Sequence, residues 1–93
     1  MGKKINKKMP LVSIVVLSYN EKKWIPKLIE SLKKQTYKNY EIIIADNNST
    51  DGTDRFTYNK FPSVKIVKNT SNLGTPGYNP AVQKAHGKYI FFI

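Results

Sequence analysis

Four apolar runs, separated by amphipathic and turn-rich segments, organise the chain. Leu11–Leu17 and Tyr40–Ala45 are nearly continuous and rich in β-branched residues, which predicts strands buried on both faces. Val64–Lys68 alternates in part and predicts a strand nearer a sheet edge. Tyr89–Ile93 predicts a fourth strand, at which the sequence stops. Between the first two strands, apolar residues from position 24 to position 32 recur with a helical period.

The first helix is expected to begin near Lys23 or Trp24, because a proline at position 26 is tolerated only in the first turn. Trp24 stands on the apolar stripe of this helix together with Ile25, Leu28, Ile29 and Leu32, so we expect it in the core.

A short second helix is expected after residues 49–51 and is stopped by Pro62. A third is expected to open with Asn79 as the N-cap and Pro80 as the first helical residue, and to end at Gly87. Single strands alternating with helices predict parallel pairing through right-handed crossovers. We therefore predict an α/β fold with three layers and a mostly parallel sheet, in the strand order 3-2-1-4.

Asp46 is the first candidate for contact with a ligand. It comes at the end of a buried strand, where a carboxylate is costly unless its charge or its hydrogen bonds are used. In open α/β sheets, ligands bind in the crevice beyond the carboxyl ends of the strands. The plainer alternative is a turn-forming role, since Asn, Ser, Thr and Gly follow directly.

The amino-acid composition limits which kinds of partner and which catalytic or metal-binding groups the chain can have. Sixteen basic residues against six acidic ones give a net charge of +10, which favours anionic partners such as nucleotide phosphates, nucleic acid or an anionic membrane. With no cysteine and one histidine, thiolate chemistry and an imidazole zinc site are excluded. Residues 1–9, which include four lysines, are expected to be a basic flexible arm, and residues 10–93 the folded part.

Four segments together resemble the family 2 glycosyltransferases. These are VSIVVLSYNE at 12–21, IIIADNNSTDGT at 42–53, NLG at 72–74 and GKYIFF at 87–92, in the family's order and spacing. The resemblance implies the GT-A fold, with a Rossmann-like nucleotide-binding half. It also implies an enzyme that transfers a sugar from a nucleotide-diphosphate sugar, often a UDP-sugar, to an acceptor hydroxyl.

Carried over to this sequence, the resemblance places Tyr19, Asn20 and Glu21 at the base and ribose pocket, and gives Asp46 a hydrogen bond from the base. The segment with Gly74 would pass the ribose and diphosphate. The residues expected to bind the nucleotide are Ser18, Tyr19, Asn20, Glu21, Asp46, Asn48, Asp51, Asn72, Gly74, Gly77 and Asn79. For Asp51 the alternative is simple capping of the second helix, and for Asn20 capping of the first.

Two departures from the family pattern matter. The segment before the third helix carries Pro76 and Pro80, which are expected to shorten that helix. The family's Asp-x-Asp metal motif would begin where this sequence ends, so we expect no metal, cofactor or catalytic residue within these residues. Mg²⁺ or Mn²⁺, and a catalytic base, are expected in the full-length family domain. The fragment is expected to be inactive alone.

Three other classes of protein fit the sequence less well. A dinucleotide-binding domain needs a glycine-rich turn after the first strand, and residues 18–23 contain no glycine. A response-regulator-like receiver would need paired acids there, and Asn20-Glu21 does not supply them. A small basic nucleic-acid-binding α/β module fits the charge, but no reading motif is present, so no nucleic-acid partner is expected.

The expected partners are therefore a nucleotide-sugar donor and, through a missing C-terminal part, a carbohydrate or lipid-linked acceptor. An uncovered sheet edge at the fourth strand is expected to favour self-association. The lysines are expected to permit weak contact with a membrane surface, and the expected location is cytoplasmic, at the inner membrane surface.

Overall fold

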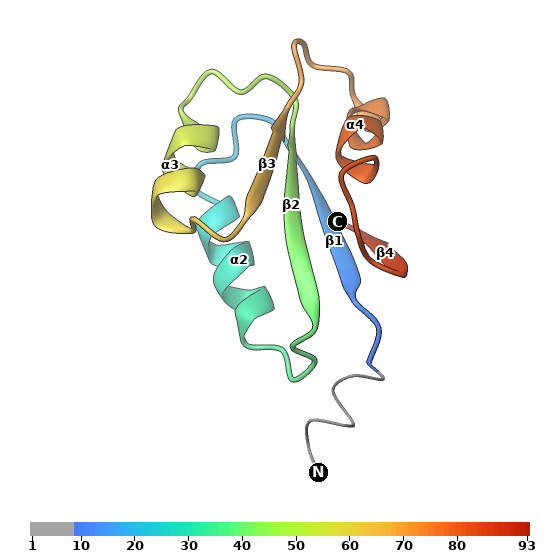
Figure 1. Cartoon of the computed structure of the whole chain (residues 1–93). Helices are drawn as coiled ribbons and strands as arrows, with labels where there is room; N and C mark the ends of the chain where they lie inside the picture. Colours follow the sequence, from blue (N-terminus) through green and yellow to red (C-terminus); the bar gives the residue numbers. More distant parts are fainter. Residues whose placement is uncertain (1–8) are drawn as a thin grey trace.

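The computed structural model describes residues 9–93 and shows a four-stranded parallel sheet in the order β3-β2-β1-β4 (Figure 1). The inner strands are β1 (Val12–Ser18) and β2 (Tyr40–Asp46), and the outer strands are β3 (Lys65–Lys68) and β4 (Tyr89–Phe92). The predicted α/β class and strand order are confirmed. The predicted basic arm lies, apart from Met9, outside the described residues.

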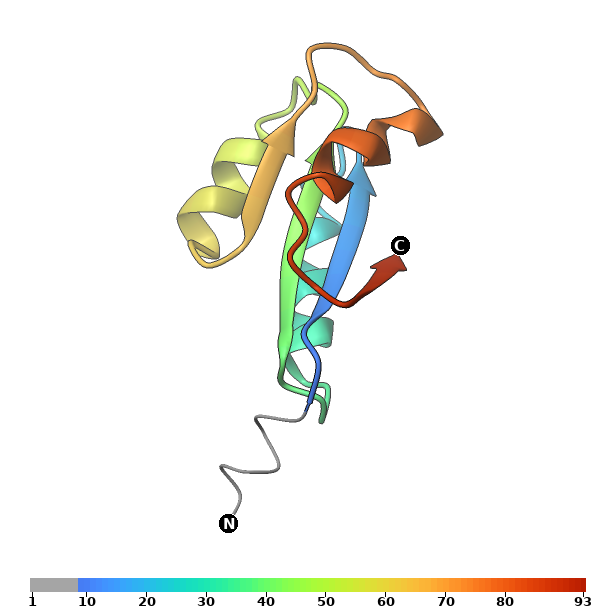
Figure 2. The ribbon, with the colours of Figure 1, turned by 45° about the vertical axis from the view of Figure 1, so that its right-hand side comes forward.

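Helices cover both faces of the sheet, so the fold has three layers. Figure 2 shows α2 (Ile25–Lys33) on one face and α4 (Tyr78–Val82) on the other. The helix α3 (Thr53–Lys60) packs beside α2, and a 3₁₀ turn, η1 (Thr75–Gly77), leads directly into α4. Within residues 9–93, no helix has the length and apolar character that crossing a membrane requires.

The alternation of side chains along the strands divides the core into two layers. In β1, β2 and β3, even-numbered residues such as Ile14 and Ile44 lie on the face that packs against Ile25 and Ile29 of α2. Odd-numbered residues pack on the opposite face, against α4; they include Val15, Ile43 and Ala45, which meet Ala81. Because both faces of β1 and β2 are covered, these strands are apolar almost throughout, as their sequences predicted.

The prediction for Trp24 is wrong. Its side chain is 67% exposed, while the stripe that enters the core consists of Ile25 and Ile29, with Leu28 and Leu32 partly buried beside them. The helix begins one residue later than Trp24, which stands at the N-cap position. Pro26 lies in the first turn, as expected.

The third helix also differs from its prediction. Gly77, not Asn79, occupies the N-cap position, because the 3₁₀ turn that contains Pro76 runs straight into α4. The five-residue helix is short, as the two prolines suggested, and it ends at Val82 rather than at Gly87. Gly87 instead lies against β1, where its N–H donates to the Ser13 hydroxyl at 2.8 Å.

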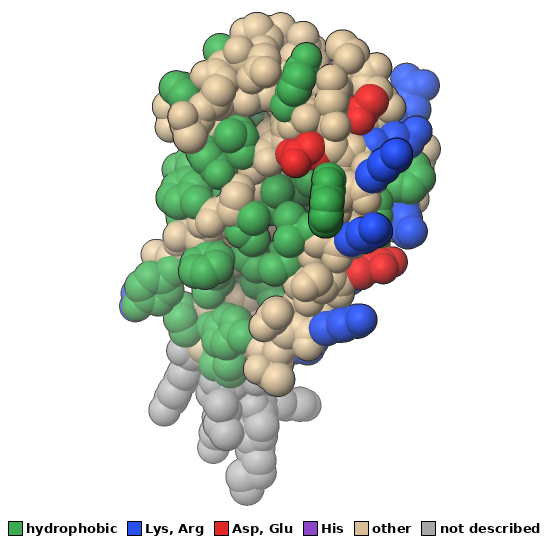
Figure 3. Space-filling view, turned by 180° about the vertical axis from the view of Figure 1, so that it is seen from behind, with side chains coloured by type: hydrophobic (Ala, Val, Ile, Leu, Met, Phe, Trp, Pro, Cys, Tyr) green, Lys and Arg blue, Asp and Glu red, His purple; other side chains and the backbone are tan. Residues whose placement is uncertain are grey.

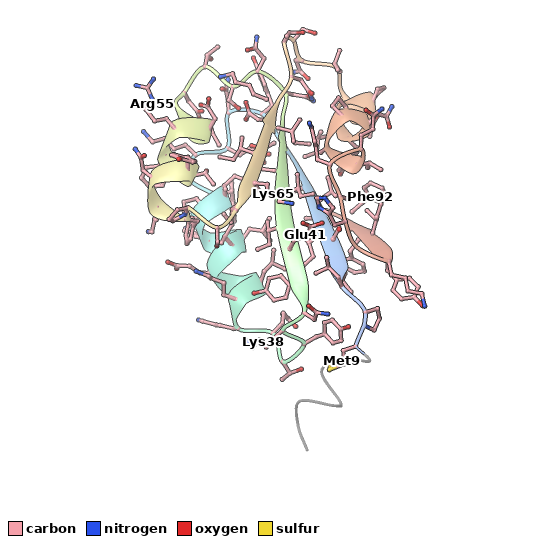
Figure 4. All side chains as sticks on the ribbon, in the orientation of Figure 1. Met9, Lys38, Glu41, Arg55, Lys65 and Phe92 are labelled. Atoms are coloured by element: carbon pink, nitrogen blue, oxygen red, sulfur yellow. The ribbon has the colours of Figure 1, made fainter. Side chains whose placement is uncertain are left out.

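One carboxylate, that of Glu41, joins three strands to the loop before β4. It accepts hydrogen bonds from the Ser13 hydroxyl at 2.6 Å, from the His86 N–H at 2.7 Å and from the Lys65 ammonium at 3.0 Å. Figure 4 shows Glu41 on β2 next to Lys65 on β3. Partial burial alone would raise the pKa of Glu41, but the hydrogen bonds from His86, Ser13 and Lys65 outweigh it and lower the pKa to about 2.

Candidate functional site

Two central strands end side by side at the carboxyl edge of the sheet. Ser18 of β1 is paired in register with Asp46 of β2, and the N–H of Asn47 donates to the Ser18 carbonyl at 2.8 Å. Three polar side chains, those of Ser18, Asp46 and Asn47, are thus buried together at this edge. Because a buried polar group is costly without partners, the hydrogen bonds of each side chain indicate its role.

The carboxylate of Asp46 is fully buried and faces its own turn. It accepts the N–H of Ser49 at 2.9 Å and the Ser49 hydroxyl at 2.5 Å. Asp46 therefore organises the turn that follows β2, which was the plainer of the two roles considered for it. A ligand would reach this carboxylate only if the bonds to Ser49 were exchanged for bonds to the ligand.

The hydroxyl of Ser18 differs from its neighbours because it has no hydrogen-bond partner among residues 9–93. Ser18 is 1% exposed and lies beside the strand that carries Asp46. A hydroxyl group both donates and accepts, and leaving it unpaired inside a protein costs about 1–3 kcal/mol. At this edge of the sheet, the Ser18 hydroxyl is thus left without a hydrogen bond within the described part of the chain, whereas the side chains of Asp46 and Asn47 beside it have theirs.

Asn20 fastens the loop after β1 to the loop after β2. Its side-chain oxygen accepts the N–H of Thr50 at 2.7 Å and the N–H of Asp51 at 3.3 Å, while its own N–H donates to the Ser49 hydroxyl at 2.9 Å. Its backbone is left-handed, with φ of 52°, a conformation that asparagine tolerates better than most residues. Asn20 does not cap α2; it clamps two loops together.

Asp51 extends the same clamp. Its carboxylate accepts the N–H and the hydroxyl of Thr53 at the start of α3, and the N–H of Lys22 at 3.3 Å. Desolvation opposes ionisation, but the hydrogen bonds from Thr53 and Lys22 together outweigh it and lower the pKa of Asp51 below its ordinary value. The Asp51 carboxylate thus holds the first residue of α3, while Gly52 occupies the N-cap position of that helix.

The third loop is held to the same edge through buried amide groups. The Asn47 side chain donates to the Gly74 carbonyl at 3.0 Å and accepts from the Asn69 side chain at 2.8 Å. Asn69 also donates to the Gly77 carbonyl at 3.0 Å, and its N–H bonds to the Asp46 carbonyl at 2.7 Å. The segment from 69 to 77 is therefore fixed over the ends of the strands.

The remaining predicted residues take more peripheral places. Asn72 is exposed and accepts the N–H of Gly74, which has a positive φ of 66°. Asn48 is half-buried and also left-handed, with φ of 65°. The Tyr19 ring is 44% exposed.

Two predicted residues have backbone roles in helices. The carbonyl of Glu21 accepts the first N–H groups of the turn that opens α2, from Trp24 and Ile25. Asn79 is exposed within α4 and its carbonyl accepts the N–H of Gln83, so the structure does not bring its side chain into the loop cluster.

Sequence reasoning missed four residues at this edge: Asn47, Ser49, Asn69 and Lys68. Lys68 ends β3 opposite Asp46, and its ammonium bonds to the Ser49 carbonyl at 3.3 Å and to Asp54 at 3.0 Å. That ion pair outweighs partial burial and lowers the pKa of Asp54. The only sequence signal for Asn47 and Ser49 was their place directly after a buried strand.

The described residues offer no metal centre. Between residues 9 and 93, no group of three or more His, Asp or Glu side chains is placed to hold an ion. The carboxylates near the edge, those of Asp46, Asp51 and Asp54, are each occupied by hydrogen bonds within the protein. The arrangement therefore provides hydrogen-bonding loops, not ligands for a cation.

A parallel α/β sheet with three interlocked polar loops at its carboxyl edge has the architecture of a doubly wound fold, in which ligands bind beyond the carboxyl ends of the strands. The profile of the family described as "Glycosyl transferase family 2" matches residues 13–93. The chain belongs to this family, and the resemblance seen in the sequence is confirmed.

The proteins that are similar to this chain are named as glycosyltransferases or have the structure of one. A sequence relative is the UDP-Glc:alpha-D-GlcNAc-diphosphoundecaprenol beta-1,3-glucosyltransferase WfaP of Escherichia coli, 44% identical over 87 residues, which are 91% of this chain and 35% of the relative. A similar structure is that of TarS of Staphylococcus aureus in complex with UDP, with a TM-score of 0.76, 31% identity, and coverage of 88% of this chain and 26% of that one.

A second similar structure is the mannosyltransferase PcManGT of Pyrobaculum calidifontis in complex with GDP-Man and Mn²⁺. Its TM-score is 0.77 at 27% identity, with 87% of this chain and 26% of that chain covered. These are GT-A glycosyltransferases, so the predicted fold is confirmed. The chain spans about a third of the length of the Escherichia coli relative.

Proposed function

We propose that this chain supplies the nucleotide-binding part of a glycosyltransferase that moves a sugar from a UDP-sugar to an acceptor hydroxyl. The observation that carries the proposal is the interlocked carboxyl edge, where Asn20 joins the first two loops and Asn47 joins the third. Binding between such loops is what doubly wound sheets do. The UDP complex of a similar structure and the UDP-Glc in a relative's name support the choice of nucleotide.

Two roles remain open for Asp46 within this proposal. In the first, the carboxylate leaves Ser49 and accepts an N–H from the base, a strong charge-assisted bond. In the second, it stays with Ser49 and only shapes the loop. Replacing Asp46 alone does not separate them, because both roles predict weaker binding.

A pair of variants does separate them. Isothermal titration with UDP should show at least tenfold weaker binding for Asp46→Ala, as expected when a charged hydrogen bond is lost. If Asp46 contacts the base, Ser49→Ala releases one bond to the carboxylate and weakens binding less than Asp46→Ala does, although it also removes the acceptor for the Asn20 N–H. If Asp46 only shapes the turn, Ser49→Ala weakens binding as much as Asp46→Ala does. No binding of UDP or GDP by the unmodified chain would overturn the proposal itself.

The acceptor and the metal belong to the whole protein. The relative named above acts, by its name, on a lipid-linked diphosphate sugar, and we propose an acceptor of the carbohydrate or lipid-linked class. Such an acceptor presents its head group at a membrane surface, which favours a cytoplasmic location at the inner membrane. The described residues do not form a site for Mg²⁺ or Mn²⁺, so no catalytic step is assigned to them.

Self-association through the sheet edge is a further part of the proposal. From Tyr89 to Ile93 every residue is at least 36% exposed, and β4 pairs only with β1 among the described strands. An edge strand with free backbone groups and apolar side chains is a template for pairing. We propose that a second copy of the chain pairs there when nothing else covers this edge.

A further inference from the structure

The outer side of the α2–α3 layer carries lysines around two aromatic rings that are not in the core. Trp24 is 67% exposed and Phe56 is 36% exposed. The Lys27 ammonium lies 5.6 Å from the centre of the Trp24 ring, and Lys22 and Lys60 lie 5.4 Å and 6.0 Å from that of Phe56. We call this the basic–aromatic face; its residues are Lys22, Lys23, Trp24, Lys27, Phe56 and Lys60.

The charge of this region is positive even after its acids are counted. Four carboxylates lie on or beside α2 and α3, those of Glu21, Glu30, Asp51 and Asp54, and the last of these is paired with Lys68 at 3.0 Å. Glu30 faces Lys60 at 3.9 Å, and Asp51 is engaged with backbone N–H groups of Lys22 and Thr53. Lys33 and Lys34 add two more cations on α2. Figure 3 shows Lys and Arg side chains gathered along the side of the molecule that carries α2 and α3.

An exposed indole beside lysines has a specific chemical preference. Trp is apolar over its rings but donates a hydrogen bond through its N–H, so it favours the boundary between water and acyl chains. Lysine stems lie along apolar surface while their ammonium groups stay at the level of the lipid phosphates. Both partners are at the start of α2, where Trp24 and Lys27 stand one turn apart.

We propose that the basic–aromatic face docks on the surface of an anionic lipid bilayer, with the Trp24 ring entering the head-group layer. The contact is peripheral, since no described helix is able to cross a membrane. Nucleic acid is the other polyanion to consider, but direct base reading relies most on arginine, and the sequence contains one, Arg55. Lysines that are not part of a motif for base recognition fit lipid phosphates better than they fit the bases of a nucleic acid.

Docking in this way would also orient the nucleotide-binding edge. Trp24 lines a pocket of about 410 Å³ together with Asn20, Glu21 and Asp51, residues of the two clamped loops. The carboxyl edge of the sheet is therefore next to the docking face. An acceptor anchored in the same bilayer would then reach the loops at the carboxyl edge without leaving the membrane surface.

Binding of the full chain to vesicles tests the proposal, with Trp24, the one tryptophan of the sequence, as the reporter. Vesicles of phosphatidylcholine that also contain the anionic lipid phosphatidylglycerol should shift the fluorescence emission of Trp24 to shorter wavelength, and vesicles of pure phosphatidylcholine should not. In sedimentation with the anionic vesicles, Lys23→Glu/Lys27→Glu should bind more than tenfold more weakly, since each lysine near the surface contributes about fivefold. Trp24→Ala should also sediment less.

The matched control is Lys84→Glu/Lys88→Glu, which makes the same change in charge between α4 and β4. Its binding should fall at least fivefold less than that of the α2 variant. Equal losses in the two variants would overturn the proposal, because binding would then follow net charge alone. So would loss of binding when Lys3, Lys4, Lys7 and Lys8 are replaced by Ser, or displacement of the vesicles by an oligonucleotide at equal phosphate concentration.

Discussion

Gly77 packs so closely against the side chain of Asn47 that a methyl group on its Cα would overlap the Asn47 amide. The same amide donates to the Gly74 carbonyl and accepts from Asn69, so it has no free direction in which to move. A glycine is needed here for space and not for its backbone angles. The closeness of these two residues sets how tightly the third loop lies on the sheet.

Gly77→Ala should therefore lower the free energy of unfolding by about 2 kcal/mol, the usual cost of forcing a methyl group into a filled site. It should also weaken UDP binding, because the loop from 69 to 77 is displaced. Urea unfolding and calorimetric titration measure the two effects. Ser71→Ala, an exposed change in the same loop, serves as control and should alter neither quantity. An unchanged midpoint for Gly77→Ala would contradict this account of the packing.

Asn20 combines a backbone requirement and a side-chain requirement, and two substitutions separate them. Asn20→Gly keeps the left-handed backbone but removes the acceptor for Thr50 and Asp51, so stability should fall by about 1 kcal/mol. Asn20→Ala adds backbone strain and should cost about 1 kcal/mol more. Urea unfolding compares the two. Equal stability of the glycine variant and the unmodified chain would show that the clamp contributes nothing.

Glu41 gives a prediction for acid unfolding. Its pKa falls from an ordinary value of 4.5 to about 2 in the folded chain, so its contribution is complete above about pH 4.5 and is lost as the pH falls towards 2. About 2 kcal/mol of stability should disappear across that window, after allowance for the part of the carboxylate that meets water. Thermal unfolding at several pH values measures it.

Glu41→Gln is the control for that titration. It cannot ionise, so it should be less stable at neutral pH and should lose less stability between pH 4.5 and 2. Asp51→Asn removes a different carboxylate and should leave the contribution of Glu41 intact. Identical pH profiles for the unmodified chain and Glu41→Gln would contradict the assignment.

The exposed strand β4 predicts concentration-dependent association. Phe91 is 63% exposed, whereas Phe92 packs edge to face with Tyr78 at 5.1 Å between ring centres. Phe91→Ser should therefore reduce association without disturbing the fold. Light scattering after size exclusion measures the mass, and Trp24→Ser, an exposed aromatic change on another surface, should leave association unaltered. A monomer at every concentration would contradict the proposed pairing.

Much of the fold could be predicted from the sequence, because it is carried by local pattern. The apolar runs of β1 and β2 and the spacing of Ile25 and Ile29 depend on burial, which repeats with the period of the element. Trp24 was misplaced because the period alone does not say where a helix begins. The residue stands just before the first turn, where the stripe no longer points inward.

The site was less predictable because its residues meet across long distances in sequence. Asn20 bonds to the backbone of residues thirty positions later, and Glu41 to a backbone N–H forty-five positions later. Asp46 was singled out correctly as a residue at the edge, but whether its carboxylate turns inward or outward depends on Ser49. Asn79 was misplaced since the 3₁₀ turn at Thr75 begins the helical segment earlier than Pro80 suggested.

The clamp made by Asn20 has a consequence for the timing of recognition. Two loops that are already tied to each other in the absence of a ligand lose little freedom when one arrives. The nucleotide site at this edge should therefore be largely preformed before the nucleotide binds. The association rate of the nucleotide should be set by diffusion and by attraction to the surrounding lysines. It should not be limited by a slow rearrangement of the loops around the nucleotide.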